Sequence, residues 1–158
     1  MINEEAKLKK FIKEQGIQAE HLRFDESLHT VQDILRVTGI DLKNITKTMI
    51  FKGPQGRTIA AMVPAEFRVS ESRLSKAAGF ENLELANPNV AHERIGYPVG
   101  GMPCFGYEAI LVIDPTVFEQ EYIYTGGGSE FSITKLSTQE LKRVTHPIIQ
   151  RIKGNKSN

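Results

Sequence analysis

The chain has 158 residues and a mass of 17.7 kDa, with 40% hydrophobic residues, 25% charged residues and a formal net charge of +1. This size suits one domain that buries a core without disulfides or a structural metal, and the composition excludes a disordered chain. The near-neutral charge also argues against a domain that coats nucleic acid, because such domains have a pI above ~9 and this chain has a pI near 7.9.

The cysteine content and the N-terminal residues indicate a reducing compartment. Cys104 is the single cysteine, so no internal disulfide can form, and no Cys/His spacing matches a zinc site. Residues 1–13 mix acids with lysines and lack the apolar segment of a secretion signal. No apolar run approaches the ~18 residues of a membrane span. We therefore expect a cytoplasmic protein with one domain over residues 1–158 and with no membrane, metal or cofactor.

Capping residues, glycines and apolar periodicity predict the elements of the N-terminal half. In chain order, these are a helix between Asn3 and Gly16, a strand over 21–24, a helix over 31–38, and a hairpin of the strands 45–52 and 57–64. Thr30 is expected to cap the second helix with Asp33 three residues on, as in a capping box.

The same signals predict the elements of the C-terminal half. The first three are a helix from Ser70 to Gly79, a strand over 83–86 and a helix that begins at Asn87-Pro88. They are followed by a strand over 109–114, a hairpin of 121–125 and 131–136, and a last helix, which begins at a capping box over 137–140 and which Pro147 bends or ends.

From Leu141 onward there are five basic residues and no acid. We expect a frayed basic tail over 147–158, with a phosphate-binding arm as the alternative. Strands in hairpins predict an α+β fold with a mixed, mostly antiparallel, barrel-like sheet surrounded by helices.

Lys47 is the first candidate functional residue. It shares its strand face with the apolar residues Ile45, Met49 and Phe51, whereas the polar residues of the strand, Thr46, Thr48 and Lys52, are expected on the other face. A lysine that points inward needs an anionic partner. Either Lys47 binds an anionic group, or its side chain reaches solvent at the end of the strand.

Two glycine-rich segments are candidate binding loops. Gly96–Gly106 contains four glycines and two prolines, and its backbone N–H groups could bind an oxyanion or a phosphate. It matches neither the Walker pattern nor a dinucleotide fingerprint, so a packed surface loop is the alternative. The triple glycine Gly126–Gly128 is expected to form a loose hairpin loop.

Cys104 is a weak candidate nucleophile. A catalytic cysteine needs a neighbouring base, and the four histidines are distant in sequence and lack metal-ligand spacing, namely His21, His29, His92 and His146. We expect Cys104 to be inert and the histidines to be surface or capping groups; a thiol hydrolase is the alternative.

Several segments together resemble the YbaK/ProX family of aminoacyl-tRNA deacylases, which are related to the editing insertion of bacterial prolyl-tRNA synthetases. The segments that carry the resemblance are His29-Thr30-Val31, residues 45–51, residues 60–64, Gly96–Gly106 and residues 124–128. Their order and spacing match the family from about Gly16 to Leu141. The resemblance implies a mixed β-barrel with surrounding helices.

The resemblance also implies roles for individual residues. Lys47 corresponds to the family's essential lysine, which holds the aminoacyl end of the tRNA, and Gly100 and Gly101 correspond to the loop glycines at the ester. These three form the expected catalytic set. The expected substrate-binding residues, which line the amino-acid pocket and its far wall, are Phe24, Thr30, Met49, Tyr97, Gly126 and Gly127.

The implied function is a freestanding hydrolase that removes a small amino acid, such as alanine, cysteine or serine, from mischarged tRNA, with tRNA-Pro as an expected substrate. Prolyl-tRNA synthetase or an elongation factor is the expected partner that delivers the aminoacyl-tRNA. The cysteine-specific branch has a serine where this chain has Gly126 and an aspartate near Ser132 or Ile133, so we do not expect cysteinyl-tRNA specificity. These departures also motivate the alternative, a non-catalytic module that binds aminoacyl-tRNA or protein.

Overall fold

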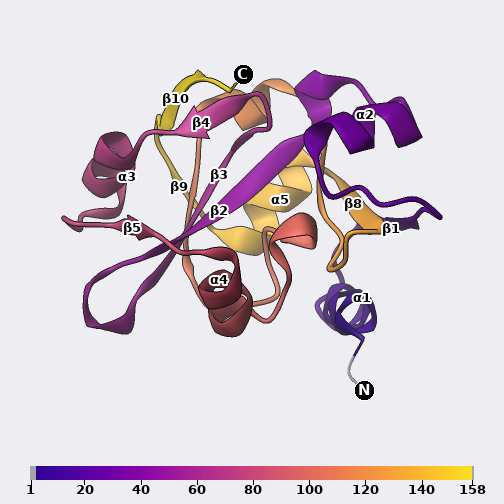
Figure 1. The fold of residues 1–158 in the computed structure, drawn as a ribbon, viewed down its shortest axis with the longest axis horizontal. Coiled ribbons are helices and arrows are strands. Elements are labelled where there is room, and N and C mark those ends of the chain that lie inside the picture. The colour runs from indigo at the N-terminus through magenta and orange to yellow at the C-terminus, as the bar shows by residue number, and fades with distance from the viewer. Residues whose placement is uncertain (1–2, 158) are drawn as a thin grey trace.

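The computed structural model describes residues 3–157, which form helices around three small sheets (Figure 1). The α-helices are α1 (Glu4–Glu14), α2 (Val31–Thr38), α3 (Glu71–Ala78), α4 (Pro88–Ile95) and α5 (Thr138–Thr145). The strands are β1 (Ala19–Arg23), β2 (Thr46–Lys52), β3 (Thr58–Pro64), β4 (Phe67–Val69), β5 (Glu84–Leu85), β6 (Ile110–Ile113), β7 (Tyr122–Gly126), β8 (Ser132–Ser137), β9 (Ile148–Ile149) and β10 (Lys153–Lys156). Short 3-10 turns are η1 (Leu42–Asn44), η2 (Pro54–Gly56), η3 (Val99–Gly101) and η4 (Pro115–Glu119). Within this part of the chain, no helix is both long and apolar enough to cross a membrane.

The predicted helix starts are confirmed by their side-chain caps. Asn3 accepts from the N–H of Glu5, and Thr30 and Asp33 form the expected reciprocal capping box. Ser137 caps α5 through the N–H of Glu140 at 3.0 Å, although the Glu140 carboxylate bonds to other partners instead of closing a box. The helix boundaries could therefore be predicted from local chemistry alone.

The sheets are mixed and mostly antiparallel, as predicted, but they do not close into a barrel. The largest sheet has the order β5-β2-β3-β6-β9, β1-β8-β7 is a second sheet, and β10 pairs with β4. The hairpins β2–β3 and β7–β8 are antiparallel, whereas β6 runs parallel to β3 and β9 runs parallel to β6. One isolated bridge, between Ile45 and Tyr124, joins the first two sheets. The fold is therefore an open α+β arrangement.

The expectation of a frayed C-terminal tail is wrong for residues 148–157. β9 and β10 extend the sheets, and Ile152 between them is fully buried. The Asp114 carboxylate, at the end of β6, accepts the N–H groups of Ile152 and Lys153 at 2.8 Å each. Asn158 lies outside the described residues. An apolar anchor and a buried acceptor outweigh the basic composition of this segment.

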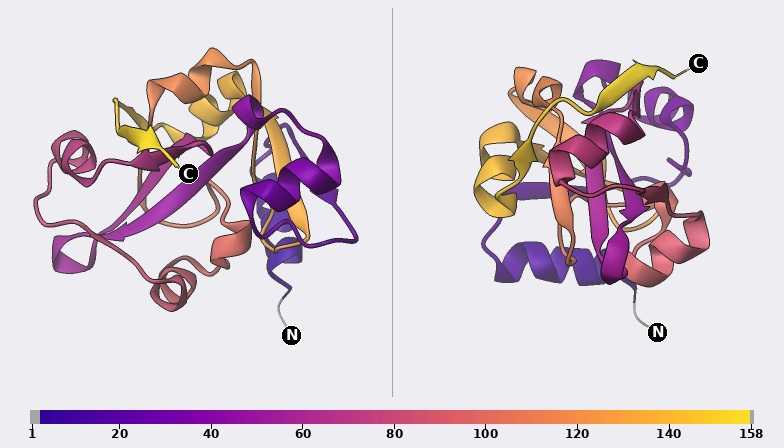
Figure 2. Two further views of the ribbon diagram at one scale, coloured as in Figure 1. Left: turned by 45° about the horizontal axis from the view of Figure 1, so that its top comes forward. Right: turned by 90° about the vertical axis from the view of Figure 1, so that its left-hand side faces the viewer.

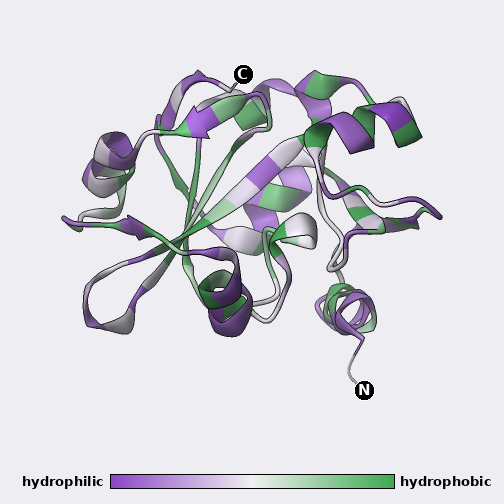
Figure 3. Ribbon diagram, viewed as in Figure 1, coloured by the Kyte–Doolittle hydropathy of each residue, from purple (hydrophilic) through white to green (hydrophobic). Residues whose placement is uncertain are grey.

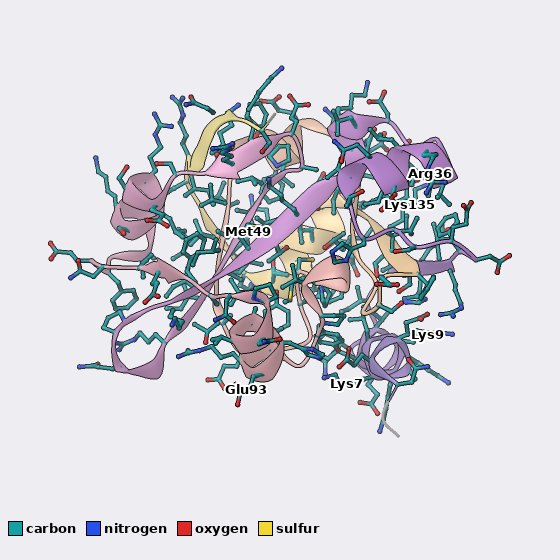
Figure 4. All side chains as sticks on the ribbon, viewed as in Figure 1. Lys7, Lys9, Arg36, Met49, Glu93 and Lys135 are labelled. Atoms are coloured by element: carbon teal, nitrogen blue, oxygen red, sulfur yellow. The ribbon has the colours of Figure 1, made fainter. Side chains whose placement is uncertain are left out.

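Two hydrophobic clusters lie on opposite faces of the main sheet, and hydrophilic residues cover the outer helices (Figure 3). Ile50 belongs to the cluster toward β7 and α1, whereas Phe51 belongs to the cluster beneath α3 and Ile152. Thr46 and Thr48 are consequently buried, although the sequence pattern favoured a solvent-facing side for them. Met49, at the middle of β2, is half-buried, whereas Lys9 and Glu93 point outward (Figure 4).

Candidate functional site

A pocket of about 280 Å³ lies along the N-terminal half of β2, beneath α2. Four segments line it: residues 28–31 and 34, residues 45–49, residues 99–102, and residues 124–126 with 132–133. β5 pairs with residues 51 and 52 of β2, and Ile45, just before β2, bridges to Tyr124. Between these contacts, no strand among the described residues pairs with residues 46–49 on the pocket side, so β2 presents a free edge there. A largely apolar, half-enclosed pocket with a few polar groups is typical of small-ligand sites.

Thr48 supplies an unpaired polar group at this edge. Its hydroxyl is buried and has no hydrogen-bond partner in the structure, and the residue is only 7% exposed. By contrast, the hydroxyl of Thr46, on the same face of β2, donates to the carbonyl of Tyr124 at 2.8 Å. A buried hydroxyl without a partner is unfavourable in the free protein. Thr48 is therefore available to a polar ligand.

Lys47 lines the same pocket and is half-buried. Burial and the neighbouring Arg68 lower the pKa of its ammonium group. Its Nζ lies 3.5 Å from the Ser157 hydroxyl, and no carboxylate within the described residues lies at ion-pair distance. The side chain therefore lies at the rim of the pocket, and no carboxylate among residues 3–157 neutralises its charge; binding of an anionic group by Lys47 stays a prediction.

The two glycine-rich segments pack directly against each other. The N–H of Gly128 donates to the carbonyl of Gly101 at 2.8 Å. A Cβ on Gly101 would overlap the backbone of Ser129, and a Cβ on Gly126 would overlap the backbone of Met102. The expected loose loop at 126–128 is in fact tightly packed, because only residues without a side chain allow the two backbones to approach so closely.

Helix α1 fixes this junction from behind through a buried carboxylate. Glu5 accepts a hydrogen bond from the Ser129 hydroxyl at 2.8 Å and pairs with Arg23. Ser129 in turn contacts the hydroxyl of Ser132, a pocket residue, at 2.9 Å. Burial alone would raise the pKa of Glu5, but the hydrogen bonds from Arg23 and Ser129 outweigh it and lower the pKa. A chain of polar contacts therefore connects α1 with the pocket.

The structure brings together six of the nine expected site residues. The pocket lining includes Lys47, Gly100, Gly101, Thr30, Met49 and Gly126. Phe24, Tyr97 and Gly127 are not among the lining residues. Tyr97 is fully buried, with Lys7 of α1 positioned 4.2 Å from the centre of its ring, so it supports the loop from behind. The carbonyl of Gly127 contacts the His21 ring at 2.8 Å, on the α1 side of the junction.

His29 is a pocket residue that we had placed among the surface groups. It precedes α2, it is exposed, and its ring packs on Gly100 so closely that a Cβ there would overlap it. Its position in the His29-Thr30-Val31 segment was a usable signal, because Thr30 fixes the start of α2 beside the pocket. Thr48 carried no such signal, since an ordinary strand threonine looks the same in sequence.

Cys104 does not face the pocket. It is 3% exposed, and burial raises the pKa of its thiol to about 12 despite a nearby Thr125 hydroxyl. At neutral pH this thiol is protonated and shielded, which does not suit a nucleophile. No group of three or more His, Cys, Asp or Glu side chains within residues 3–157 could hold a metal ion.

Fold and site together define an α+β domain whose small-ligand pocket is formed by a lysine, a free strand edge and two packed glycine loops. The model of the aminoacyl-tRNA editing domain family matches residues 25–144. The chain belongs to this family. The resemblance to editing proteins related to prolyl-tRNA synthetase is thereby confirmed.

The relatives in sequence are parts of larger enzymes. The chain is 27% identical over 107 residues to the proline–tRNA ligase of Fervidobacterium nodosum, a match covering 68% of this chain and 18% of the ligase. The corresponding ligase of Geobacter metallireducens is 27% identical over 100 residues, covering 63% of this chain and 17% of the ligase. The chain thus matches less than a fifth of the length of either ligase.

Solved structures match the whole fold. A hypothetical protein of known crystal structure has a TM-score of 0.86 and 27% identity, with 94% of this chain and 99% of that chain covered. A candidate trans-editing enzyme for prolyl-tRNA synthetase has a TM-score of 0.87 and 18% identity, with 98% of this chain and 99% of that chain covered. At this identity the second likeness shows the fold alone.

Proposed function

We propose that the protein is a cytoplasmic trans-editing deacylase, which hydrolyses the ester between a small amino acid and the 3′ end of a mischarged tRNA, with tRNA-Pro as the expected carrier. The observation that carries this proposal is that one pocket of about 280 Å³ gathers Lys47, Gly100 and Gly101 from distant parts of the chain. A pocket of this size has room for a small amino acid such as alanine, cysteine or serine, and its volume alone does not choose among amino acids. Prolyl-tRNA synthetase or an elongation factor would deliver the charged tRNA.

The chemistry requires placement more than a reactive side chain. In this mechanism, the oxygen of a water attacks the ester carbonyl carbon, the bond to the ribose oxygen breaks, and a proton passes to that oxygen. The Gly101 N–H donates to the Pro98 carbonyl at 3.0 Å, so we assign oxyanion stabilisation to the N–H of Gly100. One such donor can contribute roughly 3 kcal/mol to the transition state. Lys47 would hold the aminoacyl end in place, which contributes through positioning.

Among residues 3–157, no carboxylate lines the pocket, and this observation favours the second candidate function, a non-catalytic module that binds aminoacyl-tRNA. Hydrolysis without a carboxylate base relies on the reactivity of the aminoacyl ester itself. Activity measurements separate the two candidates directly.

The test follows the deacylation of alanyl-, cysteinyl- and seryl-tRNA by the wild-type protein and by the variants Lys47→Ala and Lys47→Met. We expect one ester to be hydrolysed and both variants to lose about 100-fold in kcat/KM, since positioning of this kind contributes at least that much. Lys52→Met is the matched control, because Lys52 lies on the same strand, pairs with Glu84 and does not line the pocket. Binding of charged tRNA without hydrolysis would instead support the non-catalytic module.

A further inference from the structure

The C-terminal strand β10 ends beside Lys47, which lines the pocket. β10 pairs with β4, with Lys153 opposite Val69 and Lys156 opposite Phe67. The strand and α2 lie on opposite sides of β2 (Figure 2). Because Asp114 and the buried Ile152 anchor the start of β10, its side chains have a fixed location.

Three cations lie on this two-stranded ribbon. We define the basic ribbon as Arg68 of β4 with Lys153 and Lys156 of β10. The ammonium of Lys153 lies 4.3 Å from the centre of the Phe67 ring, and that of Lys156 lies 5.9 Å from it. Lys156 pairs with Glu66 at 3.3 Å, whereas neither Arg68 nor Lys153 has a carboxylate at ion-pair distance within residues 3–157. The ribbon therefore carries a net positive charge.

Lys47 connects this ribbon with the pocket. Its Nζ lies 3.5 Å from the hydroxyl of Ser157, the residue that follows β10, while the same lysine lines the pocket. Arg68 is close enough to Lys47 to lower the pKa of its ammonium group, after burial as the larger cause. Two neighbouring cations without a carboxylate between them form an electrostatic site for an anion.

A cavity that adjoins the pocket is less suited to an anion than the side at Lys47. A second cavity of about 450 Å³ shares His29, Val99 and Gly100 with the pocket. Among the residues that the structure describes, its lining includes the carboxylates of Glu130 and of Glu4, which contacts the His92 ring at 2.5 Å, and no lysine or arginine. Phosphates that leave the pocket on that side would meet like charges, whereas phosphates that leave past Lys47 reach the basic ribbon.

We propose that the basic ribbon binds the phosphates of the single-stranded 3′ end of tRNA as that strand leaves the pocket past Lys47. This inference rests on the proposed function, because it takes the ligand of the pocket to be the aminoacyl end of a tRNA. Lysine and arginine that contact phosphates release counterions, so each contact adds to the salt dependence of binding. The two lysines beside Phe67 keep their charges at the surface while their stems pack.

The test uses a triple variant, Arg68→Gln, Lys153→Gln and Lys156→Gln. The matched control removes three charges from α1 through Lys9→Gln, Lys10→Gln and Lys13→Gln, all of which are exposed and distant from the pocket lining. Binding of uncharged tRNA-Pro is measured by fluorescence anisotropy at several salt concentrations. We expect the ribbon variant to bind about tenfold more weakly at low salt, with a salt slope smaller by about 2, and the control to match the wild type.

Hydrolysis provides a second readout. For a hydrolysed amino acid, kcat/KM is compared between aminoacyl-tRNA and the same amino acid esterified to adenosine, which has no phosphate. In the ribbon variant, kcat/KM for aminoacyl-tRNA divided by kcat/KM for the adenosine ester should fall about tenfold, because KM for aminoacyl-tRNA rises. A variant with Lys153→Arg and Lys156→Arg keeps the charges and should bind tRNA as the wild type does. The melting temperature of the triple variant shows whether it is folded.

The outcomes of these measurements decide whether the basic ribbon binds tRNA. Equal weakening by the ribbon and control variants, or no weakening by either, overturns the inference, as does a wild-type protein that does not bind tRNA. If the wild-type protein hydrolyses no ester but the ribbon variant alone loses tRNA binding, the proposed function fails and the ribbon surface stands.

Discussion

The two flanks of the pocket come from opposite ends of the chain and are built by different means. On one flank, α1 supports two glycine loops whose backbones touch, and the buried carboxylate of Glu5 bonds to Ser129. On the other flank, Asp114 anchors β10, which leaves its cations exposed. Under the proposed function, the first flank would position the ester and the second would attract the phosphates of the tRNA. The terminal segments therefore flank the pocket without lining it.

The largest expected effect is a loss of stability, and it compares the flank of the two glycine loops with the flank of β10. Gly126→Ala should destabilise the protein by about 3 kcal/mol, because its Cβ would overlap backbone atoms that cannot move aside cheaply. Gly154→Ala is the matched substitution on β10, where a Cβ would lie at an ordinary 3.5 Å from the Arg68 carbonyl, and it should change stability by less than about 1 kcal/mol. Urea unfolding of the two variants measures this difference. Equal losses would contradict the contrast between the flanks.

Removing the carboxylate of Asp114, which anchors β10, should give the next largest change in the free energy of unfolding. Asp114 accepts four hydrogen bonds, from the backbone and the hydroxyl of Thr116 and from two N–H groups of the C-terminal segment. Burial alone would raise the pKa of Asp114, but these bonds lower it overall. Asp114→Asn should cost about 2 kcal/mol at neutral pH. It should also weaken tRNA binding more than hydrolysis of an adenosine ester, since it loosens β10.

The pH dependence checks the same residue. Because the folded-state pKa lies below the unfolded value of ~3.9, the stabilisation by Asp114 is fully present above that value and is lost as the pH falls through the folded pKa. Thermal unfolding from pH 6 to pH 2.5 should show a smaller loss of stability for Asp114→Asn than for the wild type. Glu5→Gln changes the carboxylate on the other flank and serves as the comparison. We expect this substitution to change kcat and to leave tRNA affinity unchanged. Parallel pH profiles of the wild type and Asp114→Asn would contradict this assignment.

Two threonine substitutions on β2, between the flanks, should have smaller effects on stability. Thr48→Val should stabilise the free protein by about 1 kcal/mol, because it removes a buried hydroxyl without a partner, and should raise KM if a substrate group bonds there. Thr46→Val removes a hydroxyl that is already bonded to the Tyr124 carbonyl, so it should destabilise by about 1 kcal/mol. Opposite shifts in melting temperature are therefore expected. Shifts of the same sign would show that Thr48 has a partner in solution.

The smallest expected effect concerns Cys104. Cys104→Ala should leave turnover unchanged, because the thiol is buried, has a pKa of about 12 and lies outside the pocket lining. Steady-state kinetics of the variant beside its melting temperature provide the check. Loss of turnover in a folded variant would reinstate the thiol hydrolase.

Local chemistry explains what could be predicted from the sequence. Caps such as Thr30 depend on neighbouring residues only, so the helix boundaries were predictable, as were the two hairpins. Lys47 stood out because a cation in an apolar alternation is costly. The pairing of Glu5 with Ser129 could not be foreseen, since it joins residues distant in sequence. The burial of Thr46 and Thr48 could not be predicted, because it depends on a second sheet that covers their face of β2. The pairing of β10 could not be predicted either, because it depends on hydrogen bonds from the distant Asp114 carboxylate.

Helix α2 has a broader consequence, because none of its residues is fully buried although Val31 and Ile34 form a wall of the pocket. Its apolar side faces the cavity instead of the core, so α2 contributes little to global stability. Under the proposed function, the pocket-lining residues of α2 could therefore change in evolution without endangering the fold. We expect α2 amides to show the fastest hydrogen exchange among the helices and to slow most when a ligand fills the pocket.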